Sequence, residues 1–364
     1  MTSYPLPDIE IGGPYTTEAL QAEIDAAVAN PAVHTIGLGR QSALVLPPDG
    51  ATYAKRLRIA KPVVAGDIRG GFVIDPRGGT EGPAAWYGGR LVVDTTGAPF
   101  DQHAGLFFLG DVNRPEIGAR VIGADVAVAN GQRLNRAFWL KNAADVTLDA
   151  PRVFFAAGER IPGTSGGSAG RSFLSVEIGS SVDVYYPDAA IEDPENRDDA
   201  ISARGSCRLI GGVFRNFESL FGLTDTDPAA VIEADWPVLI DCTRLVYVKP
   251  SVFGPGPMTV YGATVRNATM HASGGEFWSL MRAWAATAIG AQAGVAQNVR
   301  IEGAIVHAPS ALDLVDIKMG PAGSLSGLYV QATCYLDTPP PSLVKATGPA
   351  CRLGIETDIS VITP

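Results

Sequence analysis

The chain has 364 residues, a formal net charge of -10 at pH 7 and 42 glycines. The acidic balance excludes a nucleic-acid-binding protein, because such a protein needs a basic stripe to neutralise phosphates. No run of about 18 apolar residues occurs, so the sequence predicts no insertion into a membrane. The share of glycine exceeds the usual value of about 7% and is typical of a fold with many corners.

Residues 1–15 form a lead rich in proline and glycine, which we expect to be extended and to serve as an anchor to a partner. The first basic residue is Arg40, and no apolar core precedes it. The sequence therefore predicts no signal peptide. We expect the protein to be made in the cytoplasm without a secretion signal.

One amphipathic helix is predicted over residues 16–30. Thr16 or Thr17 suits the N-cap position, and the pair Asn30-Pro31 ends the segment. Its apolar residues fall on one helical face: Leu20, Ile24, Ala27 and Val28. Ahead of a stack of strands, such a helix would cover the apolar interior and the unpaired strand edges of the first turn. We expect it to be a cap.

Beyond the helix, short apolar strands alternate with corners that carry glycine, asparagine, aspartate or proline. Residues 196–217, NRDDAISARGSCRLIGGVFRNF, give a strand, a small-residue turn and a second strand. Similar phrases return with a loose period of roughly 20 to 40 residues, from these inward positions: Val146, Val182, Cys207, Met258, Val299 and Leu325. The interval from Cys207 to Met258 is long enough for two turns. The pattern predicts a β-solenoid rather than a sandwich, whose strands would be longer and strictly alternating.

The region after the helix resembles a known superfamily. Residues 46–53 read LPPDGATY, and residues 56–71 read RLRIAKPVVAGDIRGG, which gives two strands and a glycine-rich turn. This order resembles the opening of the pectate-lyase-like, right-handed parallel β-helix proteins, and the later coils match only generically. The resemblance implies an all-β fold, a single-stranded right-handed parallel β-helix over residues 16–336 with one N-terminal capping helix.

Cysteine and histidine form no metal-binding motif in the sequence. The cysteines have no CxxC spacing, and three of the four fall within apolar strand phrases, so we expect inward-facing free thiols: Cys207, Cys242, Cys334 and Cys351. The histidines stand in neither HxH nor HExxH spacing: His34, His103, His271 and His307. The sequence thus predicts no metal site and no cofactor, and it favours no Ser-His-Asp triad.

The best match to a catalytic motif lies between residues 198 and 225. In the pectate lyase pattern a GDAIS-type strand is followed by WIDH and DGLID, whose acidic residues hold calcium. Here DDAIS supplies Asp198 and Asp199, but Gly211 and Gly212 stand at the WIDH position, and only Asp225 remains of DGLID. Because a calcium site needs several oxygen ligands at once, this loss disfavours lyase chemistry of that type.

An alternative keeps these carboxylates as catalysts. Glycoside hydrolysis needs two carboxylates about 5 to 9.5 Å apart, and successive coils stack about 4.8 Å apart. Asp198, Asp199 and Asp225 would then be the catalytic residues of a polysaccharide lyase or glycosidase. The competing interpretation is that acidic residues at solenoid corners cap backbone amides. Arg204 and Asp227 lie in the same stretch, and Arg204 either pairs with a carboxylate or recognises an acidic sugar.

Two tryptophans complete the candidate carbohydrate-binding set with Arg204 and Asp227. Trp278 and Trp284 have the flat apolar faces that stack on sugar rings. Alternation along a strand would put one of Phe277 and Trp278 in the interior, so core packing competes with sugar binding here. Trp284 is the better candidate for an exposed platform.

The functional expectation follows from the resemblance. β-Helix proteins of this kind include tail spikes, head spikes and fibres of bacteriophages and phage-like particles, which usually trimerise and bind host-surface polysaccharide. The resemblance implies a homotrimeric spike on a particle surface, which binds cell-surface polysaccharide and contacts other particle proteins through its termini. Residues 337–364, a proline-rich C-terminal segment, would be a cap or an interface. The alternatives are a polysaccharide lyase or glycosidase, and a structural adaptor of the particle.

Overall fold

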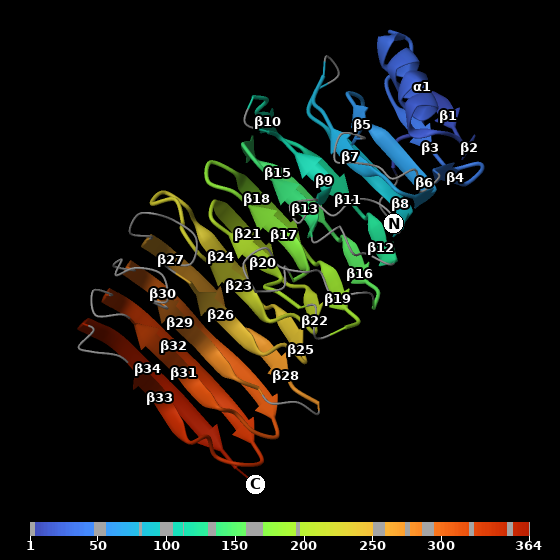
Figure 1. Cartoon of the computed structure of the whole chain (residues 1–364). Helices are drawn as coiled ribbons and strands as arrows, with labels where there is room; N and C mark the ends of the chain where they lie inside the picture. The colour runs from blue at the N-terminus through green and yellow to red at the C-terminus, as the bar shows by residue number, and fades with distance from the viewer. Residues whose placement is uncertain are drawn as a thin grey trace. The chain divides into compact units, whose positions relative to one another are not determined.

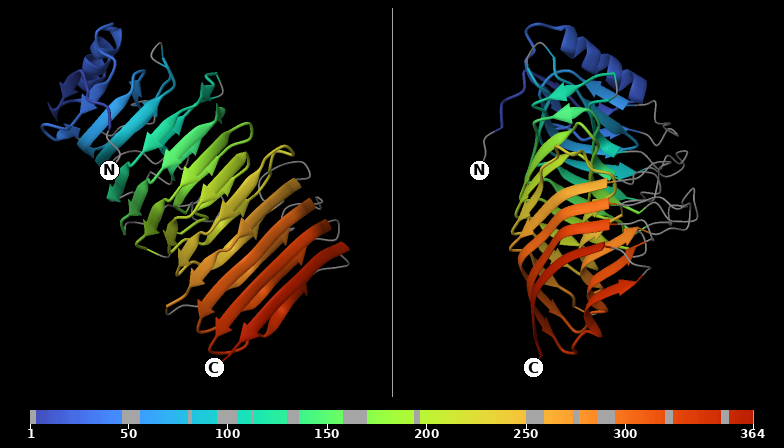
Figure 2. Two further views of the ribbon diagram at one scale, coloured as in Figure 1. Left: turned by 180° about the vertical axis from the view of Figure 1, so that it is seen from behind. Right: turned by 90° about the vertical axis from the view of Figure 1, so that its left-hand side faces the viewer.

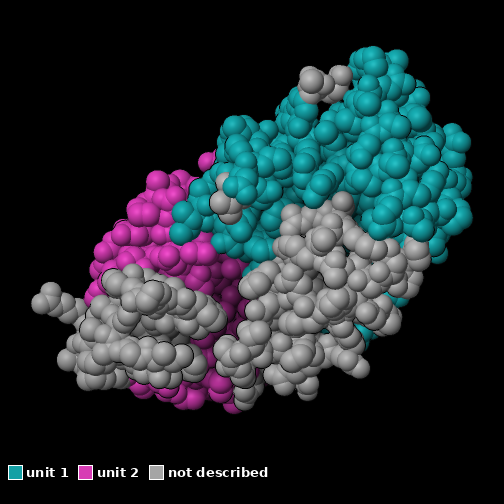
Figure 3. Space-filling model, turned by 45° about the horizontal axis from the view of Figure 1, so that its top comes forward, with its two compact units in different colours: residues 1–197 teal, residues 198–364 magenta. Residues whose placement is uncertain are grey.

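A computed structural model describes most of the chain in thirteen segments: residues 4–46, 56–79, 82–94, 105–111, 113–129, 136–157, 170–193, 197–249, 259–273, 277–285, 295–319, 324–347 and 352–363. Contacts divide the chain into two compact units, residues 1–197 and residues 198–364 (Figure 3). Within each unit, short strands of successive coils pair in parallel (Figure 1). The predicted all-β, parallel β-helix fold with one N-terminal helix is confirmed.

Unit 1 stacks its coils in three ladders. The first contains β1 Ile9–Ile11, β3 Ile36–Leu38, β6 Val63–Gly70, β8 Ala85–Asp94, β11 Arg120–Ile122, β15 Val146–Asp149 and β18 Ser181–Tyr185. The second shares β6 and β8 and adds β2 Gly13–Pro14, β4 Leu44–Leu46, β12 Asp125–Ala129, β16 Arg152–Phe155 and β19 Asp188–Ile191. The third contains β5 Arg56–Ile59, β7 Val73–Pro76, β9 Gly105–Leu109, β13 Arg136–Leu140 and β17 Ser172–Val176. A short pair, β10 Glu116–Ile117 and β14 Ala143–Ala144, lies at a corner.

Unit 2 repeats this arrangement. The first ladder contains β21 Ser206–Ile210, β24 Ile232–Asp235, β27 Thr259–Arg266, β30 Val295–Ala308, β32 Ser324–Leu336 and β34 Arg352–Ile362. The second contains β22 Val213–Arg215, β25 Val238–Ile240 and β28 Thr269–His271, and it continues in β30. The third contains β20 Ile201–Ala203, β23 Ser219–Leu223, β26 Arg244–Val248, β29 Ser279–Ala285, β31 Asp313–Met319 and β33 Ser342–Thr347. Figure 2 shows the long orange and red strands of its last coils side by side.

The helix α1, Thr17–Ala29, has the predicted N-cap, because the Thr16 hydroxyl accepts a hydrogen bond from the Ala19 amide at 3.2 Å. Leu20, Ile24 and Ala27 are buried on the predicted face. The helix has no basic residue in its last turn, but Lys61 compensates from the coil beneath. Its buried ammonium donates to the carbonyl oxygens of the helix end, at 3.2 Å to Ala27 and 2.7 Å to Asn30.

The two terminal segments take part in the β-helix. Strands β1 and β2 lie within the predicted lead and pair with β3 and β4. Strands β33 and β34 lie within the predicted C-terminal segment and continue the ladders of β31 and β32. The coils therefore extend beyond residues 16–336 on both sides.

The period inferred from the sequence agrees with part of the observed register. Val146 pairs with Val182, and the long interval after Cys207 does hold an additional coil, whose Ile232 pairs with Cys207. The proposed equivalence of Val299 and Leu325 is wrong, because Leu325 pairs with Ala296 and a register shift follows in β30. Met258 lies outside the described residues.

The interior of each unit is apolar, and aromatic rings stack between coils. In unit 1, Phe107 and Phe138 stack with ring centroids 5.2 Å apart, and Trp86 and Phe173 meet them edge-on. Among the described cysteines, the predicted buried free thiols are confirmed: Cys207, Cys242 and Cys334. Cys351 lies outside the described residues. Within the described residues, no helix has the length and apolarity needed to cross a membrane.

Unit 1 also buries an ion-pair network, which we name the unit 1 network. The fully buried Asp75 accepts from Arg114 at 2.6 Å and from Arg77 at 2.8 Å. Glu116 is also buried and accepts from Arg114 at 2.7 Å and from the Gly78 amide at 2.6 Å. Every carboxylate of this network therefore has a guanidinium partner, as buried charges require.

Candidate functional site

In unit 2, polar residues of successive coils line up in a column at the positions where the strands of the third ladder begin. Asp199 lies beside Ser219, since Ala200 donates to the Ser219 carbonyl at 2.7 Å and Glu218 to the Asp198 carbonyl at 2.9 Å. The strand register then places Ser219 beside Arg244, and Arg244 beside Ser279. We name the group around this column the polar cluster: Asp198, Asp199, Glu218, Arg244, Tyr247, Lys249 and Trp278.

Three carboxylates meet in the polar cluster. One oxygen from each of Asp198, Asp199 and Glu218 lies within 4.8 Å of the other two. Asp199 is buried, whereas the side chain of Asp198 is 38% exposed and that of Glu218 is 25% exposed. Only Asp198 and Glu218 can therefore contact a molecule that arrives from solvent.

The Lys249 ammonium supplies positive charge to this group. It lies 2.8 Å from Asp199 Oδ2, 3.8 Å from Asp198 Oδ1 and 4.3 Å from the centre of the Tyr247 ring. Burial alone would lower the pKa of Lys249, but the surrounding carboxylates raise it above its ordinary value. Lys249 therefore stays charged and occupies the place that a metal ion would take among these oxygens.

Burial has the opposite effect on Asp199. Desolvation raises the pKa of Asp199 to about 6, although Lys249 opposes this shift. The Ser219 hydroxyl contacts both Asp199 Oδ1 and the Phe221 carbonyl oxygen, the latter at 2.9 Å. A hydroxyl has one proton, so Ser219 donates to one of these two oxygens at a time.

A glycine makes room for this carboxyl. A Cβ atom on Gly222, in the next coil, would stand 1.8 Å from Asp199 Oδ2. Any side chain at position 222 would therefore displace Asp199 from its contact with Lys249.

Arg244 joins the carboxylates to the aromatic part of the cluster. Its buried guanidinium is paired with Glu218, and its carbon Cζ lies 4.6 Å from the Tyr247 ring centre and 4.8 Å from the Trp278 ring centre. A guanidinium near two aromatic rings is held by cation–π attraction. Arg244 Nε has no hydrogen-bond partner within the described residues. Trp278 is thus fixed by a cation while part of its surface stays exposed.

The structure brings together only part of the predicted catalytic set. Asp198 and Asp199 precede β20, whereas Asp225 follows β23. By the register of β20 and β23, Asp225 lies six residues beyond the position beside Asp199 and seven beyond the position beside Asp198, which corresponds to at most about 20 Å from Asp199 along an extended chain. The Asp225 carboxylate instead pairs with Arg204 at 3.4 Å, the ion pair that was one of the two expectations for that arginine.

Asp227 occupies a corner. Its carboxylate accepts from the Ala229 amide at 2.9 Å, and its own amide donates to the Arg204 carbonyl at 2.8 Å. This is the backbone-capping geometry expected for acidic residues at corners. Of the predicted carbohydrate-binding residues whose side chains the structure describes, Trp278 alone lies in the polar cluster. The alternation at Phe277 and Trp278 is as predicted, with Phe277 buried, and the side chain of Trp284 lies outside the described residues.

Sequence reasoning missed Glu218, Arg244, Tyr247 and Lys249. They come from the next two coils, so no local spacing connects them with Asp198 and Asp199. A signal did exist for one of them: the strand phrase VLIDCTRLVYV from Val238 contains Arg244. Aligning that phrase with DDAIS, coil on coil, would have placed Arg244 in the row of Asp199, because both lie in the row of Ser219.

Comparison with known proteins adds little. No protein family matches the sequence, and no curated protein does. Among solved structures, the chain is similar to the surface protein and adhesin PfbA of Streptococcus pneumoniae, with a TM-score of 0.44 and 8% sequence identity. The alignment covers 94% of this chain and 96% of that one. At this level of similarity no residue role passes from PfbA to this chain.

Proposed function

We propose that this chain is a spike or fibre protein of a virion or phage-like particle and binds cell-surface polysaccharide through the polar cluster. The observation that carries the proposal is the partly exposed Trp278, held by Arg244 beside the exposed carboxylates of Asp198 and Glu218. A sugar ring offers an apolar face to an aromatic ring and hydroxyl groups to carboxylates. Such combinations of a few polar groups with an aromatic surface are typical of ligand sites.

Binding fits this geometry better than hydrolysis. A glycosidase needs a protonated carboxyl that reaches the glycosidic oxygen. Asp199 has the raised pKa of such an acid, about 6, but it is buried and its oxygens already contact Ser219 and Lys249. Glu218 is paired with Arg244. Solvent reaches Asp198 and Glu218, but the pairing of Glu218 with Arg244 leaves no second available carboxylate to complete a hydrolytic pair.

Elimination chemistry is also disfavoured. A lyase needs a base that removes a proton from a sugar carbon. Lys249 stays protonated because its pKa is raised, and burial raises the pKa of Tyr247 above its ordinary value, so neither is a ready base. Of the two enzymatic alternatives, the glycosidase is therefore better supported than the lyase. One observation favours it: Asp198 and Asp199 lie close together, one partly exposed and the other buried.

The particle and the trimer are the wider part of the proposal. They rest on the resemblance of residues 16–71 to β-helix spike proteins. Light scattering of the purified chain tests the trimer, and mass spectrometry of purified particles from the producing cells tests the location. A monomeric chain that is absent from particles would contradict this part and leave the glycan site to be tested separately.

The glycan site is tested with a panel of acidic and neutral bacterial polysaccharides, by following both retention of intact polymer and chain shortening. We expect retention without shortening. Trp278→Ala should weaken retention about tenfold or more, since loss of one stacking contact costs about 1–2 kcal/mol. The matched control is Trp236→Gly, which removes an exposed tryptophan at a left-handed corner of the same unit and should leave retention unchanged.

Other outcomes separate the alternatives. Chain shortening that Asp199→Asn abolishes would establish a polysaccharide-degrading enzyme and replace the binding proposal. Neither retention nor shortening across the panel would contradict glycan binding and favour the structural adaptor.

A further inference from the structure

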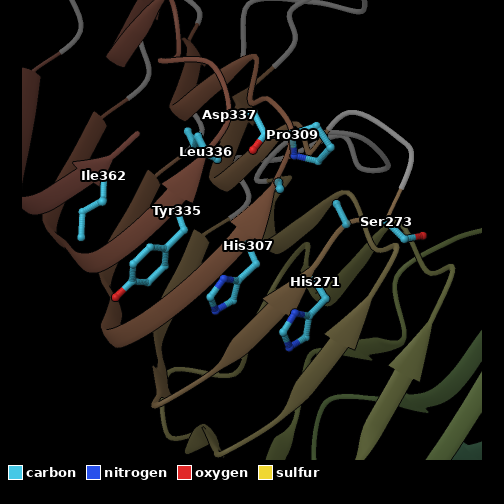
Figure 4. Close-up of a pocket in the computed structure, with 10 residues that line it drawn as sticks. His271, Ser273, His307, Pro309, Tyr335, Leu336, Asp337 and Ile362 are labelled. Carbon is cyan, nitrogen blue, oxygen red and sulfur yellow. The ribbon is translucent and has the colours of Figure 1, made fainter. Parts of the chain in front are cut away.

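The strand register of unit 2 brings two histidines together that lie 36 residues apart in the sequence. His271, at the end of β28, pairs with His307 of β30, and His307 pairs with Tyr335 of β32. The two imidazole centroids are 5.1 Å apart with ring planes 8° from parallel, and Tyr335 continues the stack at 4.8 Å and 6°. All three side chains are exposed, so this histidine–tyrosine ladder lies on the outer surface (Figure 4).

The ladder presents ring edges rather than ring faces. Its rings cover one another, and the exposed Ile362 follows Tyr335 in the same row, while Ile240 precedes His271. A sugar or another flat ligand therefore finds no open aromatic face here. What the two imidazoles offer to solvent is their edges, which carry ring nitrogens with lone pairs.

A hollow of about 600 Å³ opens beside the ladder. A second outward row contributes to its lining, two residues further along each strand: Ser273, Pro309 and Asp337. Ser273 is already bonded to Asp241, at 3.0 Å from its hydroxyl to both carboxylate oxygens. Asp337 and Tyr335 line the same hollow as the two imidazoles, and their side chains carry oxygen atoms that can serve as ligands (Figure 4).

We infer that His271 and His307 bind one divalent transition-metal ion, such as Zn²⁺, Ni²⁺ or Cu²⁺, in this hollow, with Asp337 and Tyr335 as the available oxygen ligands. Imidazole nitrogen is a preferred ligand of these ions, and a mixed set of two nitrogens and oxygens suits them better than it suits Ca²⁺ or Mg²⁺. The inference does not depend on the proposed glycan site.

To bind one ion, the two rings must turn out of their parallel stack, because each nitrogen lone pair lies in its ring plane and the two planes are 8° from parallel. Two nitrogens on one zinc ion, each at about 2.0–2.1 Å, also lie at most about 4.2 Å apart, whereas the ring centroids are 5.1 Å apart. Because both side chains are exposed, a turn about their side-chain bonds achieves this without moving the strands.

The polar cluster is a poorer candidate for the same ion. Its three carboxylates would suit a hard cation, but the Lys249 ammonium already lies among them, 2.8 Å from Asp199. A titration with different ions therefore separates the two places: the histidine site should prefer Cu²⁺ and Ni²⁺, whereas carboxylates alone would also take Ca²⁺.

The test is isothermal titration calorimetry of the full chain, treated with EDTA and dialysed, with ZnCl₂, NiCl₂ and CaCl₂ at pH 7.5. We expect about one Zn²⁺ or Ni²⁺ per chain and no heat from Ca²⁺. His271→Phe and His307→Phe keep a stacked ring, so the ladder is preserved, but each removes one ligand nitrogen. Each should weaken Zn²⁺ affinity at least about tenfold, and Asp337→Asn should weaken it less.

The matched controls are His34→Asn, at an exposed histidine of unit 1, and Glu218→Gln in the polar cluster, both of which should leave the affinity unchanged. Circular dichroism confirms that each variant is folded. Zinc affinity that survives His271→Phe combined with His307→Phe would overturn the inference and place the ion elsewhere. No binding of Zn²⁺ or Ni²⁺ to the unsubstituted chain would overturn it as well and leave the ladder with a packing role only.

Discussion

The two units each gather acidic and basic side chains, but the unit 1 network and the polar cluster are organised differently. In unit 1 the carboxylates of Asp75 and Glu116 are both buried, and each is bonded to a guanidinium. In unit 2 Asp198 and Asp199 lie beside the Lys249 ammonium, Glu218 is paired with Arg244, and Tyr247 and Trp278 lie beside these cations. The first arrangement satisfies every charge internally, whereas the second leaves Asp198, Glu218 and Trp278 in contact with solvent.

This difference separates a structural role from a binding role. Glu116 also accepts from the Gly78 amide, so the unit 1 network holds backbone at a corner. The polar cluster instead keeps exposed hydrogen-bond acceptors beside an aromatic ring. Charged residues in a β-helix thus indicate function only when a ligand can reach them.

The largest expected effect is on the unit 1 network. Asp75→Ala leaves two guanidinium groups without their shared buried carboxylate, and we expect it to lower the free energy of unfolding by about 3 kcal/mol or more. Denaturant unfolding monitored by circular dichroism measures this. The control is Asp67→Ala, which removes the exposed pair with Arg69 in the same unit and should cost less than about 1 kcal/mol. Equal losses in both variants would show that the network is not a special stabilising element.

A smaller effect is expected from the pH dependence of Asp199. Its pKa in the folded chain, about 6, lies above the ordinary value of 3.8, so the folded state binds the proton more tightly than the unfolded state. The contribution of Asp199 to stability is therefore fully present below about pH 4 and is lost as the pH rises through about 6, by about 3 kcal/mol at most. Asp199→Asn should remove this slope.

Unfolding free energies of the unsubstituted chain and the variant, measured at intervals from pH 4 to pH 7.5, give the contribution as their difference. A difference that does not change with pH would show that Asp199 does not titrate in this range.

The smallest effect is expected at Asp225, the predicted catalytic residue that the structure places away from the cluster. Its ion pair with Arg204 is partly exposed and 3.4 Å long, so Asp225→Asn should change stability by less than about 1 kcal/mol. Polysaccharide retention should not change either. A loss of retention as large as that of Trp278→Ala would assign Asp225 to the glycan site. It would contradict our conclusion that Asp225 lies outside the polar cluster.

The fold was predictable because each coil repeats a local pattern of short apolar strands and turn residues. The helix α1 carries its own boundary signals, Thr16 and Asn30, and needs no tertiary information. The sequence signals for corners are also local, since Asn216, Asn267 and Asn298 adopt the left-handed backbone conformation that asparagine tolerates.

The sites were less predictable because they depend on the length of each coil. Asp198 and Asp199 were identified from a motif, yet their main partner Lys249 is supplied by a strand two coils further on. The histidines were dismissed because His271 and His307 do not share a local spacing. The similar segments MHAS, ending at Ser273, and VHAP, ending at Pro309, were a signal that the two histidines pair. To use this signal, one must know that both segments lie at the same position in successive coils.

The histidine–tyrosine ladder also has a consequence for how this chain tolerates insertions. One coil takes 36 residues to return to the row of His271, and the next takes only 28. Length therefore varies in the connecting segments, and β30 also holds one residue more than β32 between Ile301 and Ala304, a local bulge after which His307 still pairs with Tyr335. New loops can be added between coils without disturbing the ladder, so the surface of this protein can be re-engineered by grafting connecting segments rather than by redesigning strands.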